Sequence, residues 1–389
     1  MRRRRRTGSK FVARPLLALV AILKNEAKSV RALLESVRGV ADHVVILDTG
    51  STDGTQALAR DVLDVPVEIV EEPFIPYRDT GIINFAATRN RALDLEGGRD
   101  VFTLFLSGDE VLHGCAALRT FLEEHRESTE DAFVVEMRSG HASWLFPRVL
   151  RTDGGRRYQR PIHEVPVGKN GEQGGFIVLG VHVVHDNSDK QRLFTRMREV
   201  DLPLLTRIAE DPSTPAVERA WATHFIAQTH ENLVSESPSK KLLHQFSALA
   251  YYQQRIDMSG DKDDVNYARF RRLNVAEMAG IYTSEEMVER LEDLVKEEPR
   301  RPEVWYMLAA HAARMDPRRG AFLAVRAVEI AQAVRKAPLH LPTDGRCEWL
   351  SLRIAAECAK ALGYTSRARK LAEQGILAGG PREMFENCL

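Results

Sequence analysis

The sequence predicts an α/β domain with a doubly wound, mostly parallel sheet, followed by an all-α domain of helical repeats. Through about residue 140, short apolar runs alternate with amphipathic stretches, the order of strand, helix and strand that a parallel sheet requires. Beyond about Asp189 the strand signals stop and long amphipathic segments continue to the end. We therefore expect three parts: a disordered basic tail at 1–14, a first domain at 15–195 and a helical domain at 196–389.

Composition narrows the class of protein. The 389 residues suffice for two domains, and 55 Lys and Arg balance 55 Asp and Glu, so no overall charge favours nucleic acid. The basic run Arg2–Arg6 is interpreted as a solubilising tail. Four cysteines without metal-type spacing are typical of reduced thiols. No apolar segment approaches the roughly 20 residues of a membrane span, and Arg14 and Pro15 interrupt the first one, which argues against a secretory signal. These observations predict a cytoplasmic protein without a transmembrane segment.

The predicted elements of the first domain follow from hydrophobic periodicity. Continuous apolar runs predict strands at 16–23, 44–48, 67–72, 101–110 and 132–137. Helical spacing of apolar residues predicts helices at 27–39, 55–63, 83–95 and 114–125. From about Trp144 to His185, short strand-like pieces separated by Gly-rich turns predict an antiparallel addition to the sheet.

The second half contains four long amphipathic segments, each with an aromatic residue near its start and small residues further on: 217–233, 265–282, 301–315 and 347–364. Small residues at such spacing allow close helix packing, and recurrence at roughly 40-residue intervals suggests stacked helix pairs. Because the recurrence is irregular, an ordinary helical bundle remains the alternative.

One stretch, HVVILDTGSTDGT at 43–55, combines a buried-type strand with a polar turn. Asp48 ends the apolar run, and Gly50 and Gly54 permit the positive φ of a tight turn. Ser51, or the Thr52 and Asp53 that follow it, is expected to accept from free N–H groups of a helix that begins near Thr55. Open α/β sheets bind ligands at the carboxyl ends of their strands. Asp48 is therefore either a ligand-binding carboxylate or a plain turn former.

Several short motifs occur in a fixed order: AILKNEAKSV, ILDTGSTDGT, NFAATRNRAL, LFLSGDEVL, FPRVLR, PIHEV and VVHD. In this order they resemble a family 2 glycosyltransferase with the nucleotide-sugar-binding GT-A fold, of the kind that carries tetratricopeptide-like repeats behind the catalytic domain. The resemblance covers roughly residues 16–210 by motif and the remainder by architecture. It implies that 15–195 is the catalytic domain and that the donor is a nucleotide-sugar, most simply a UDP-sugar.

The resemblance also assigns residues to the donor. It implies that Asp48 contacts the nucleoside and that Arg89 and Asn90 form the far wall of the pocket or meet the phosphates; a surface charge is the alternative for Arg89. The implied donor-binding set is Lys24, Asn25, Glu26, Asp48, Gly50, Ser51, Arg89, Asn90 and Ser107.

The stretch LFLSGDEVL stands where the family has its Asp-x-Asp metal motif, and here the sequence departs from the pattern. Ser107 replaces the first aspartate, which leaves Asp109 and Glu110. Hard divalent ions prefer oxygen ligands, so the resemblance implies Mn²⁺ or Mg²⁺ bound by Asp109, with the late His185 as a second ligand. Loss of one acid is expected to weaken this site.

An inverting transferase needs a base near the acceptor hydroxyl. The resemblance gives this role to Glu164 in PIHEV, with His163 as the rival. If both lie on one strand, their side chains point to opposite faces and only one can face the donor.

We therefore predict an inverting glycosyltransferase that moves a hexose from a nucleotide-sugar to an acceptor hydroxyl. If the second half is a solenoid, a protein or peptide is the expected acceptor. The alternatives are a degenerate, non-catalytic transferase domain that serves as a protein-interaction platform and a nucleotidyltransferase, whose usual Gly-rich loop after the first strand is missing from AILKNEAK. Donor selectivity is expected to lie in the FIPYRDTG segment.

Overall fold

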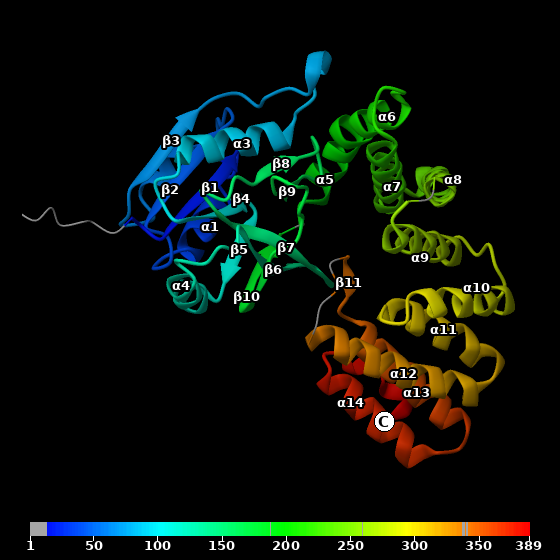
Figure 1. The fold of residues 1–389 in the computed structure, drawn as a ribbon. Helices are drawn as coiled ribbons and strands as arrows, with labels where there is room; N and C mark the ends of the chain where they lie inside the picture. The colour runs from blue at the N-terminus through cyan, green and yellow to red at the C-terminus, as the bar shows by residue number, and fades with distance from the viewer. Residues whose placement is uncertain (1–13, 187, 259, 337–338, 340) are drawn as a thin grey trace, which may run out of the picture. The chain divides into compact units, whose positions relative to one another are not determined.

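The computed structural model describes residues 14–186, 188–258, 260–336, 339 and 341–389 (Figure 1). It divides into two compact units, one of residues 1–137 and 146–186 and one of residues 138–145 and 187–389. The predicted basic tail, with Arg2–Arg6, lies outside the described residues apart from Arg14. Arg14 itself donates hydrogen bonds to the backbone oxygens of Gly98 and Arg99.

The first unit is built on a mixed sheet with the strand order β3-β2-β1-β4-β7-β6-β10-β5. Four predicted strands form its parallel part: β1 (Leu17–Leu23), β2 (His43–Asp48), β3 (Val67–Glu71) and β4 (Phe102–Ser107). Their register pairs Leu23 with Asp48 and Ile22 with Ser107. The carboxyl ends of β1, β2 and β4 therefore lie side by side at one edge of the sheet.

The remaining strands run antiparallel, as predicted for the later part of this unit. β7 (Ala142–Arg151) pairs with β4, and β5 (Glu110–His113) pairs with β10 (Phe176–His185). β6 (Ala132–Ser139) lies between β7 and β10. A separate two-stranded sheet consists of β8 (Arg157–Gln159) and β9 (Val165–Val167).

The run at 101–110 was expected to form one strand, and this expectation was wrong. β4 ends at Ser107, the chain turns at Gly108 and Asp109, and β5 begins at Glu110. The Glu110 carboxylate accepts the backbone N–H of Ser107 at 2.8 Å, which closes the turn. The spacing of apolar residues cannot reveal this turn, because the turn is stabilised by a buried carboxylate and not by an apolar side chain.

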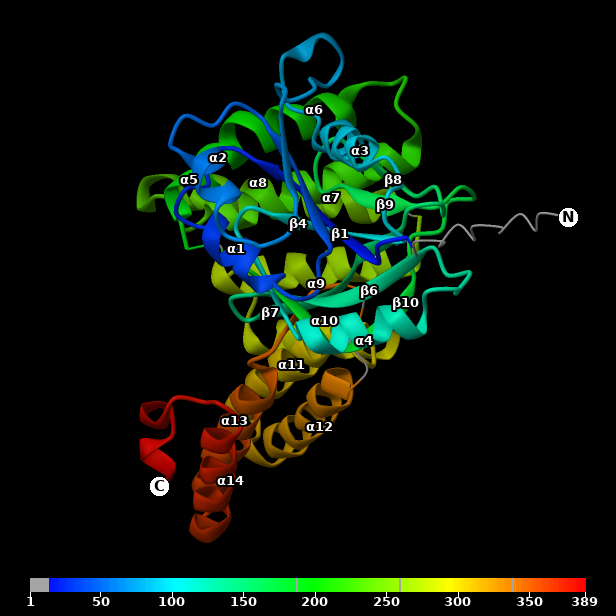
Figure 2. The same cartoon turned by 90° about the vertical axis from the view of Figure 1, so that its left-hand side faces the viewer.

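The helices of the first unit cover both faces of the sheet (Figure 2). α3 (Phe85–Glu96) lies over one face, and α1 (Val30–Ser36) and α4 (Cys115–Glu124) lie over the other. Asn84 caps α3 by accepting from the N–H of Ala87, and Gly97 ends it in the left-handed region with φ 67°. α2 (Thr55–Arg60) follows the turn after β2, and the 3₁₀ turn η1 (Arg78–Thr80) lies in the long loop before α3.

The core beneath α3 explains why the helix is fixed on the sheet. Alternate residues of β1 and β2, such as Val20 and Val45, are buried against α3 residues such as Ala86 and Leu93. In a strand, alternate side chains face the same side of the sheet. His43, two residues before Val45, therefore faces α3 as well.

The second unit consists of consecutive helices that pack against their neighbours in sequence. The helical prediction is confirmed, although several of its helices were not predicted individually. The main helices are α5 (Lys190–Arg196), α6 (Leu202–Glu210), α7 (Ala216–Leu233), α8 (Lys241–Asp257), α9 (Lys262–Met278), α10 (Ser284–Glu297), α11 (Pro302–Met315), α12 (Pro317–Lys336), α13 (Cys347–Ala361) and α14 (Thr365–Leu377). Short helical turns are η2 (Met197–Asp201), η3 (Pro238–Lys240), η4 (Arg382–Met384) and η5 (Glu386–Cys388).

The tip of the β6–β7 hairpin belongs to the second unit. Its residues Ala142 and Ser143 pair with the two residues of β11 (Thr343–Asp344). Among the described residues, no helix is both long and apolar enough to cross a membrane. All four cysteines are free thiols.

Candidate functional site

Asp48 lies at the carboxyl end of β2 and is fully buried. One of its oxygens, Oδ1, accepts the backbone N–H groups of Gly50 and Ser51 at 2.9 and 2.8 Å. Gly50 and Gly54 have φ of 100° and 89°, so both glycines adopt the positive φ that the sequence suggested. The other oxygen, Oδ2, has no hydrogen-bond partner among the described residues. Asp48 thus closes the turn with one oxygen and keeps the second uncommitted.

The loops after β1 and β2 are tied together by hydrogen bonds in both directions. The N–H of Asn25 donates to Ser51 Oγ at 2.9 Å, and Asn25 Oδ1 accepts from Thr52 N at 2.8 Å. The N–H groups of Glu26 and Ala27 donate to Thr55 Oγ1 and Asp53 Oδ2. Asn25 itself has φ 56°. The polar residues of both motifs therefore build one double loop at the carboxyl edge.

Within this double loop the predicted residues have different exposures. The side chain of Glu26 is buried, whereas Lys24 and Asn25 are exposed. The Lys24 ammonium lies 5.7 Å from the centre of the Phe74 ring. Of the expected caps of the following helix, Asp53 forms one: its Oδ1 accepts the N–H of Thr55, the first residue of α2, at 3.1 Å, although the N-cap position itself is Gly54. Ser51 and Thr52 bond to the neighbouring loop instead.

Arg89 reaches from α3 into the site and is not a surface charge. Its side chain is only 13% exposed and lies between the rings of Phe105 and Tyr158, 4.5 and 5.4 Å from their centres. It donates to Glu164 Oε1 through Nε and to Ser107 Oγ through a terminal nitrogen at 3.4 Å. Its other terminal nitrogen, Nη1, has no hydrogen-bond partner among the described residues.

Asn90, beside Arg89 on α3, has both ends of its amide engaged by the backbone of Tyr158. Nδ2 donates to the Tyr158 oxygen at 2.9 Å, and Oδ1 accepts from the Tyr158 nitrogen at 2.8 Å. Asn90 therefore fastens β8 to α3, and its contact with a donor stays a prediction. Burial, opposed by the charges of Arg89 and Arg148, raises the pKa of Tyr158 to about 12.

The SGDE turn at the end of β4 is held by a buried ion pair. Glu110 is 2% exposed, and Arg148 of β7 donates to its Oε1, while its Oε2 closes the turn. Gly108 packs directly on Glu26, since a Cβ at this position would lie 2.4 Å from Glu26 Cγ. The turn is therefore pressed against the double loop. These contacts occupy both carboxylate oxygens of Glu110, so Asp109 is the acid of this turn that a ligand can reach.

Asp109 and His185 meet at this turn. His185 Nε2 lies 3.2 Å from Asp109 Oδ2, and the two side chains are 29% and 35% exposed. Burial alone would lower the pKa of His185, but the hydrogen bond to Asp109 and the charges of Asp109 and Glu110 raise it above its usual value. One carboxylate oxygen and one imidazole nitrogen together suit a divalent ion such as Mn²⁺.

Glu164 and His163 lie in the turn between β8 and β9, not on one strand, so the argument from opposite strand faces does not apply. The Glu164 side chain is 9% exposed and forms the ion pair with Arg89. His163 has φ 46°. The backbone of this turn is joined to the start of α3 by the hydrogen bond from Phe85 N to the Pro161 oxygen at 2.7 Å.

The structure thus connects most of the predicted residues through direct contacts around the ends of β1, β2 and β4. Sequence reasoning gave no role to three residues: Arg148, which holds Glu110, and Phe105 and Tyr158, which flank Arg89. The arginine inside the stretch FPRVL of β7 and an acid directly after the motif aspartate were the available signals for the buried pair. Nothing local marked the two rings.

Comparisons with known proteins agree with this geometry. Residues 19–171 match the family model described as glycosyl transferase family 2. A TPR repeat-containing protein of Synechococcus elongatus is 25% identical over 150 residues, which are 38% of this chain and 35% of that protein. The chain therefore spans about a third of the length of this curated relative.

Two solved structures show weaker likeness. BtubC (BKLC) from P. vanneervenii has 14% identity and a TM-score of 0.38, over 49% of this chain and 74% of that one. Glucosyl-3-phosphoglycerate synthase from Mycobacterium tuberculosis, solved with Mg²⁺ and uridine diphosphate, has 15% identity and a TM-score of 0.30, over 51% and 81%. The likeness therefore rests on the family model and on the motif residues placed above: residues 19–171 of this chain are similar to a glycosyl transferase family 2 domain.

Proposed function

We propose that this chain is an inverting glycosyltransferase that moves a hexosyl group from a nucleoside diphosphate-sugar, most simply a UDP-sugar, to an acceptor hydroxyl. The observation that carries the proposal is Asp48: a fully buried carboxylate at the carboxyl edge of the sheet with one oxygen uncommitted. A buried polar atom without a partner costs stability unless a ligand satisfies it. The N–H of a pyrimidine base or a ribose hydroxyl would do so.

The diphosphate end of the donor would lie toward Arg89 and the SGDE turn. The unpartnered terminal nitrogen of Arg89 is a charged donor of the kind that binds phosphate oxygens. Ser107 already accepts from Arg89, and Gly108 brings the turn against Glu26. These contacts would hold the donor in one orientation, which contributes to the rate by fixing the reacting atoms.

Asp109 and His185 fit a divalent cation, Mn²⁺ or Mg²⁺. They supply one carboxylate oxygen and one imidazole nitrogen. The two backbone segments lie side by side, because the N–H of Asp186 donates to the backbone oxygen of Asp109 at 2.9 Å. Imidazole as a ligand favours Mn²⁺ of the two. When bound, the ion supplies positive charge that stabilises the departing nucleoside diphosphate.

Glu164 is the proposed base. In the donor-free chain it is held by Arg89, and an ion pair with a guanidinium opposes uptake of a proton by a carboxylate. We infer that Glu164 accepts the proton of the acceptor hydroxyl only after the Arg89 guanidinium binds the donor phosphates, because that contact weakens its ion pair with Glu164. Proton transfer would then wait until the donor is bound. The acceptor is proposed to be a protein or peptide recruited by the helical unit.

The test is donor binding and turnover by the full chain. Purified protein is mixed with UDP-, GDP- and TDP-sugars, with and without Mn²⁺, and scored by thermal shift and by released nucleoside diphosphate. We expect a metal-dependent shift for a UDP-sugar, slow release of UDP, and loss of both in Asp48→Asn. Asp64→Asn is the matched control because the Asp64 side chain is fully exposed.

The outcomes separate the proposed function from the alternatives. Absence of a shift with every donor at millimolar concentration contradicts the transferase and favours a non-catalytic interaction platform. Transfer of the nucleoside monophosphoryl group to the acceptor, with sugar phosphate released in place of nucleoside diphosphate, indicates nucleotidyl transfer. A shift without any effect of Mn²⁺ removes Asp109 and His185 from metal binding.

A further inference from the structure

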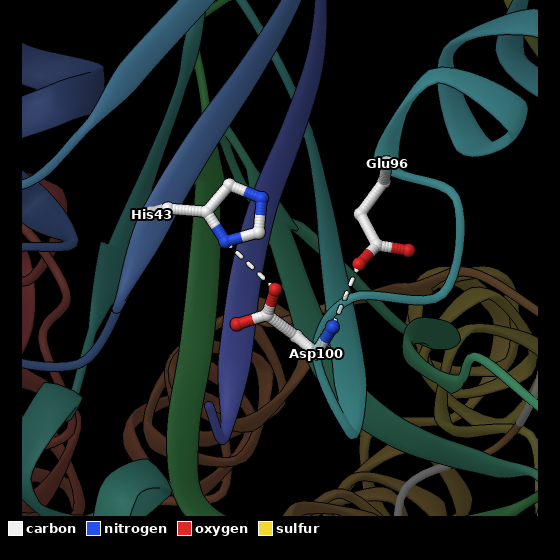
Figure 3. A group of neighbouring side chains, drawn as sticks. All are labelled: His43, Glu96 and Asp100. Carbon is white, nitrogen blue, oxygen red and sulfur yellow. Dashed lines mark hydrogen bonds and ion pairs between the residues drawn. The ribbon is translucent and has the colours of Figure 1, made fainter. Parts of the chain in front are cut away.

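A second cluster of ionisable side chains lies at the opposite edge of the same sheet (Figure 3). His43 opens β2, Asp100 shortly precedes β4, and Glu96 is the last residue of α3. Because the strand β2 begins at His43 and ends at Asp48, this amino-end cluster is separated from the candidate site by the length of the strand. None of its members has a role in the proposed transfer.

The cluster is compact and buried. His43 Nδ1 lies 2.7 Å from Asp100 Oδ2, and one ligand atom from each of the three side chains lies within 4.8 Å of the others. The side chains of His43 and Asp100 are 13% and 0% exposed, and Glu96 is 1% exposed. Figure 3 shows the imidazole and both carboxylates converging from β2, from the segment before β4 and from α3.

The charges in the cluster do not balance. Glu96 accepts the N–H groups of Gly98 and Asp100 at 2.7 and 2.9 Å. Apart from the 2.7 Å contact between its Oδ2 and His43 Nδ1, the fully buried Asp100 carboxylate has no polar partner among the described residues, and His43 Nε2 has none either. Buried charges occur where they are paired or coordinate a metal.

The nearby arginines do not supply the missing cation. Arg14 donates to the Gly98 oxygen and to Thr152 Oγ1. Arg99 donates to the backbone oxygens of Glu96 and Leu95 and pairs with Glu68. Both guanidiniums are thus engaged by other groups, and among the described residues neither one donates to the Asp100 carboxylate.

We propose that His43, Glu96 and Asp100 form a structural site for a divalent transition metal, with Zn²⁺ as the best fit. One imidazole and two carboxylates are borderline-hard ligands that Zn²⁺ accepts, and three protein ligands leave a place for water. Ligand atoms around a tetrahedral Zn²⁺ lie about 3.4 Å apart, given bonds of about 2.1 Å. The three ligand atoms, now within 4.8 Å of one another, would have to draw closer to reach that value.

A bound divalent ion would balance the two buried carboxylates. His43 Nδ1 and Asp100 Oδ2, which lie 2.7 Å apart, would each direct a lone pair to the ion. The ion would tie the end of α3 to the amino ends of β2 and β4.

The test uses the full chain with Asp109→Asn and His185→Gln, which removes the other candidate metal site. Equilibrium dialysis against micromolar Zn²⁺ is expected to give one bound ion per chain. Adding His43→Gln, or in a separate variant Asp100→Asn, should weaken binding by at least about 100-fold, because a direct ligand is lost. His141→Gln, a change at an exposed histidine, is the matched control and should leave binding unchanged.

A spectroscopic readout decides the matter even if a ligand variant fails to fold. X-ray absorption at the zinc edge of the parent double variant should fit one imidazole together with oxygen ligands. A fit with two imidazoles would place the ion at His230 and His244, whose Nδ1 atoms lie 3.0 Å apart, and would overturn the proposal. Failure of the folded double variant to bind Zn²⁺, or unchanged binding in a folded His43→Gln variant, would overturn it as well.

Discussion

At the residue scale, the acids of the candidate site differ chiefly in what holds them. Asp48 is fixed by two backbone N–H groups, and Glu110 is fixed by Arg148 and the Ser107 N–H. Asp109 faces His185 and remains a third exposed. Glu110, whose two oxygens both have internal partners, shapes the site, whereas Asp48 keeps Oδ2 uncommitted and the exposed Asp109 can exchange its partner for a ligand. We therefore expect Glu110 to hold the turn in place and Asp109 to bind a ligand.

Asp109→Asn tests the exposed acid. We expect the metal-dependent rate of donor turnover to fall by at least about 100-fold, because the ion that stabilises the leaving group loses its charged ligand. The fold should persist, since the Asp109 side chain is partly exposed and the turn is closed by Glu110. Turnover assays with Mn²⁺ and circular dichroism measure the two effects. A near-normal rate in the folded variant would show that Asp109 does not bind the metal.

Glu164→Gln tests the proposed base. The amide cannot take a proton, so we expect the rate of the chemical step to fall by about 10²–10⁴-fold while donor affinity changes much less. Single-turnover rates and donor titrations separate the two quantities. His163→Gln is the control on the same turn and should keep most of the rate. Loss of donor affinity alone in Glu164→Gln would limit this residue to holding Arg89.

Local pattern was sufficient for some of these residues and not for others. The positions of Asp48 and its glycines at a strand end and in a tight turn could be predicted, because the residues that signal such a turn are adjacent in the sequence. The partners of Arg89 and Glu110 lie on β7, on β8 and in the turn after β8, tens of residues away. Their identity depends on strand pairing, which one sequence does not specify. Asn90 was expected at the donor, yet its amide is used by Tyr158.

At the element scale, close backbone approach decides how the helices of the second unit pack. A Cβ on Gly320 of α12 would lie 2.5 Å from both Cα and Cβ of Ala313 on α11. These are backbone and near-backbone atoms, which cannot rotate away. The small residues noted in the sequence therefore lie at a real contact between consecutive helices.

Gly320→Ala is expected to destabilise the second unit. Overpacking of this kind costs roughly 1–3 kcal/mol, against about 1 kcal/mol gained from helix propensity, so the net free energy of unfolding should fall. Urea denaturation followed by circular dichroism measures the difference. Gly174→Ala, where a Cβ meets nothing within 4 Å, is the control. Equal or higher stability of Gly320→Ala would mean that α11 and α12 are further apart than described.

Two histidines make the contact between α7 and α8 sensitive to acid. Burial and the nearby His244 lower the pKa of His230 to about 4, and burial and Lys240 lower that of His244. Tyr251 stacks on His230, and Glu236 lies 3.9 Å from His244 Nε2. The unfolded chain, with an ordinary value near 6.5, takes up the proton first. Stability is therefore complete above that value and is lost as the pH falls from about 6.5 toward 4.

His230→Gln should remove part of this loss. Between pH 7 and pH 5 the wild type is expected to lose roughly 1 kcal/mol through His230, a figure reduced because the ring is partly exposed to solvent. Denaturant unfolding at both pH values measures the difference, and the variant should show a smaller one. His141→Gln, at an exposed position, should behave as the wild type. An identical acid loss in His230→Gln would contradict the role of the pair.

Element prediction succeeded where a segment is long and periodic and failed where pairing or a side chain interrupts it. β1, β2 and α3 follow continuous apolar runs or clear helical spacing. β5 was merged with β4 because Val111 and Leu112 continue the apolar run after the turn that Glu110 closes. β8 and β9 have three residues each, too few for any period to show.

At the scale of the whole molecule, the two units have separate cores. In the first unit, Val20, Val45 and Phe105 are buried together beneath α3. In the second, Leu291, Met307 and Ala324 belong to a cluster built entirely from helices. The change in the sequence from alternating strands and helices to helices alone marks this division, because each kind of layer needs its own apolar face. The assignment of 138–145 to the second unit depends on pairing with β11 and left no local signal.

Separate cores predict separate unfolding, and the donor should act on only one of them. A ligand that binds the folded state at 100 times its Kd stabilises by about 2.7 kcal/mol. For a unit of this size that raises the midpoint by roughly 5–10 °C. Calorimetry of the full chain with UDP and Mn²⁺ should therefore raise one transition, and Asp109→Asn should abolish that rise. Gly320→Ala should lower the other transition and leave the response to UDP intact. If both transitions move together in every case, the two units unfold as one and the prediction of separate unfolding is wrong.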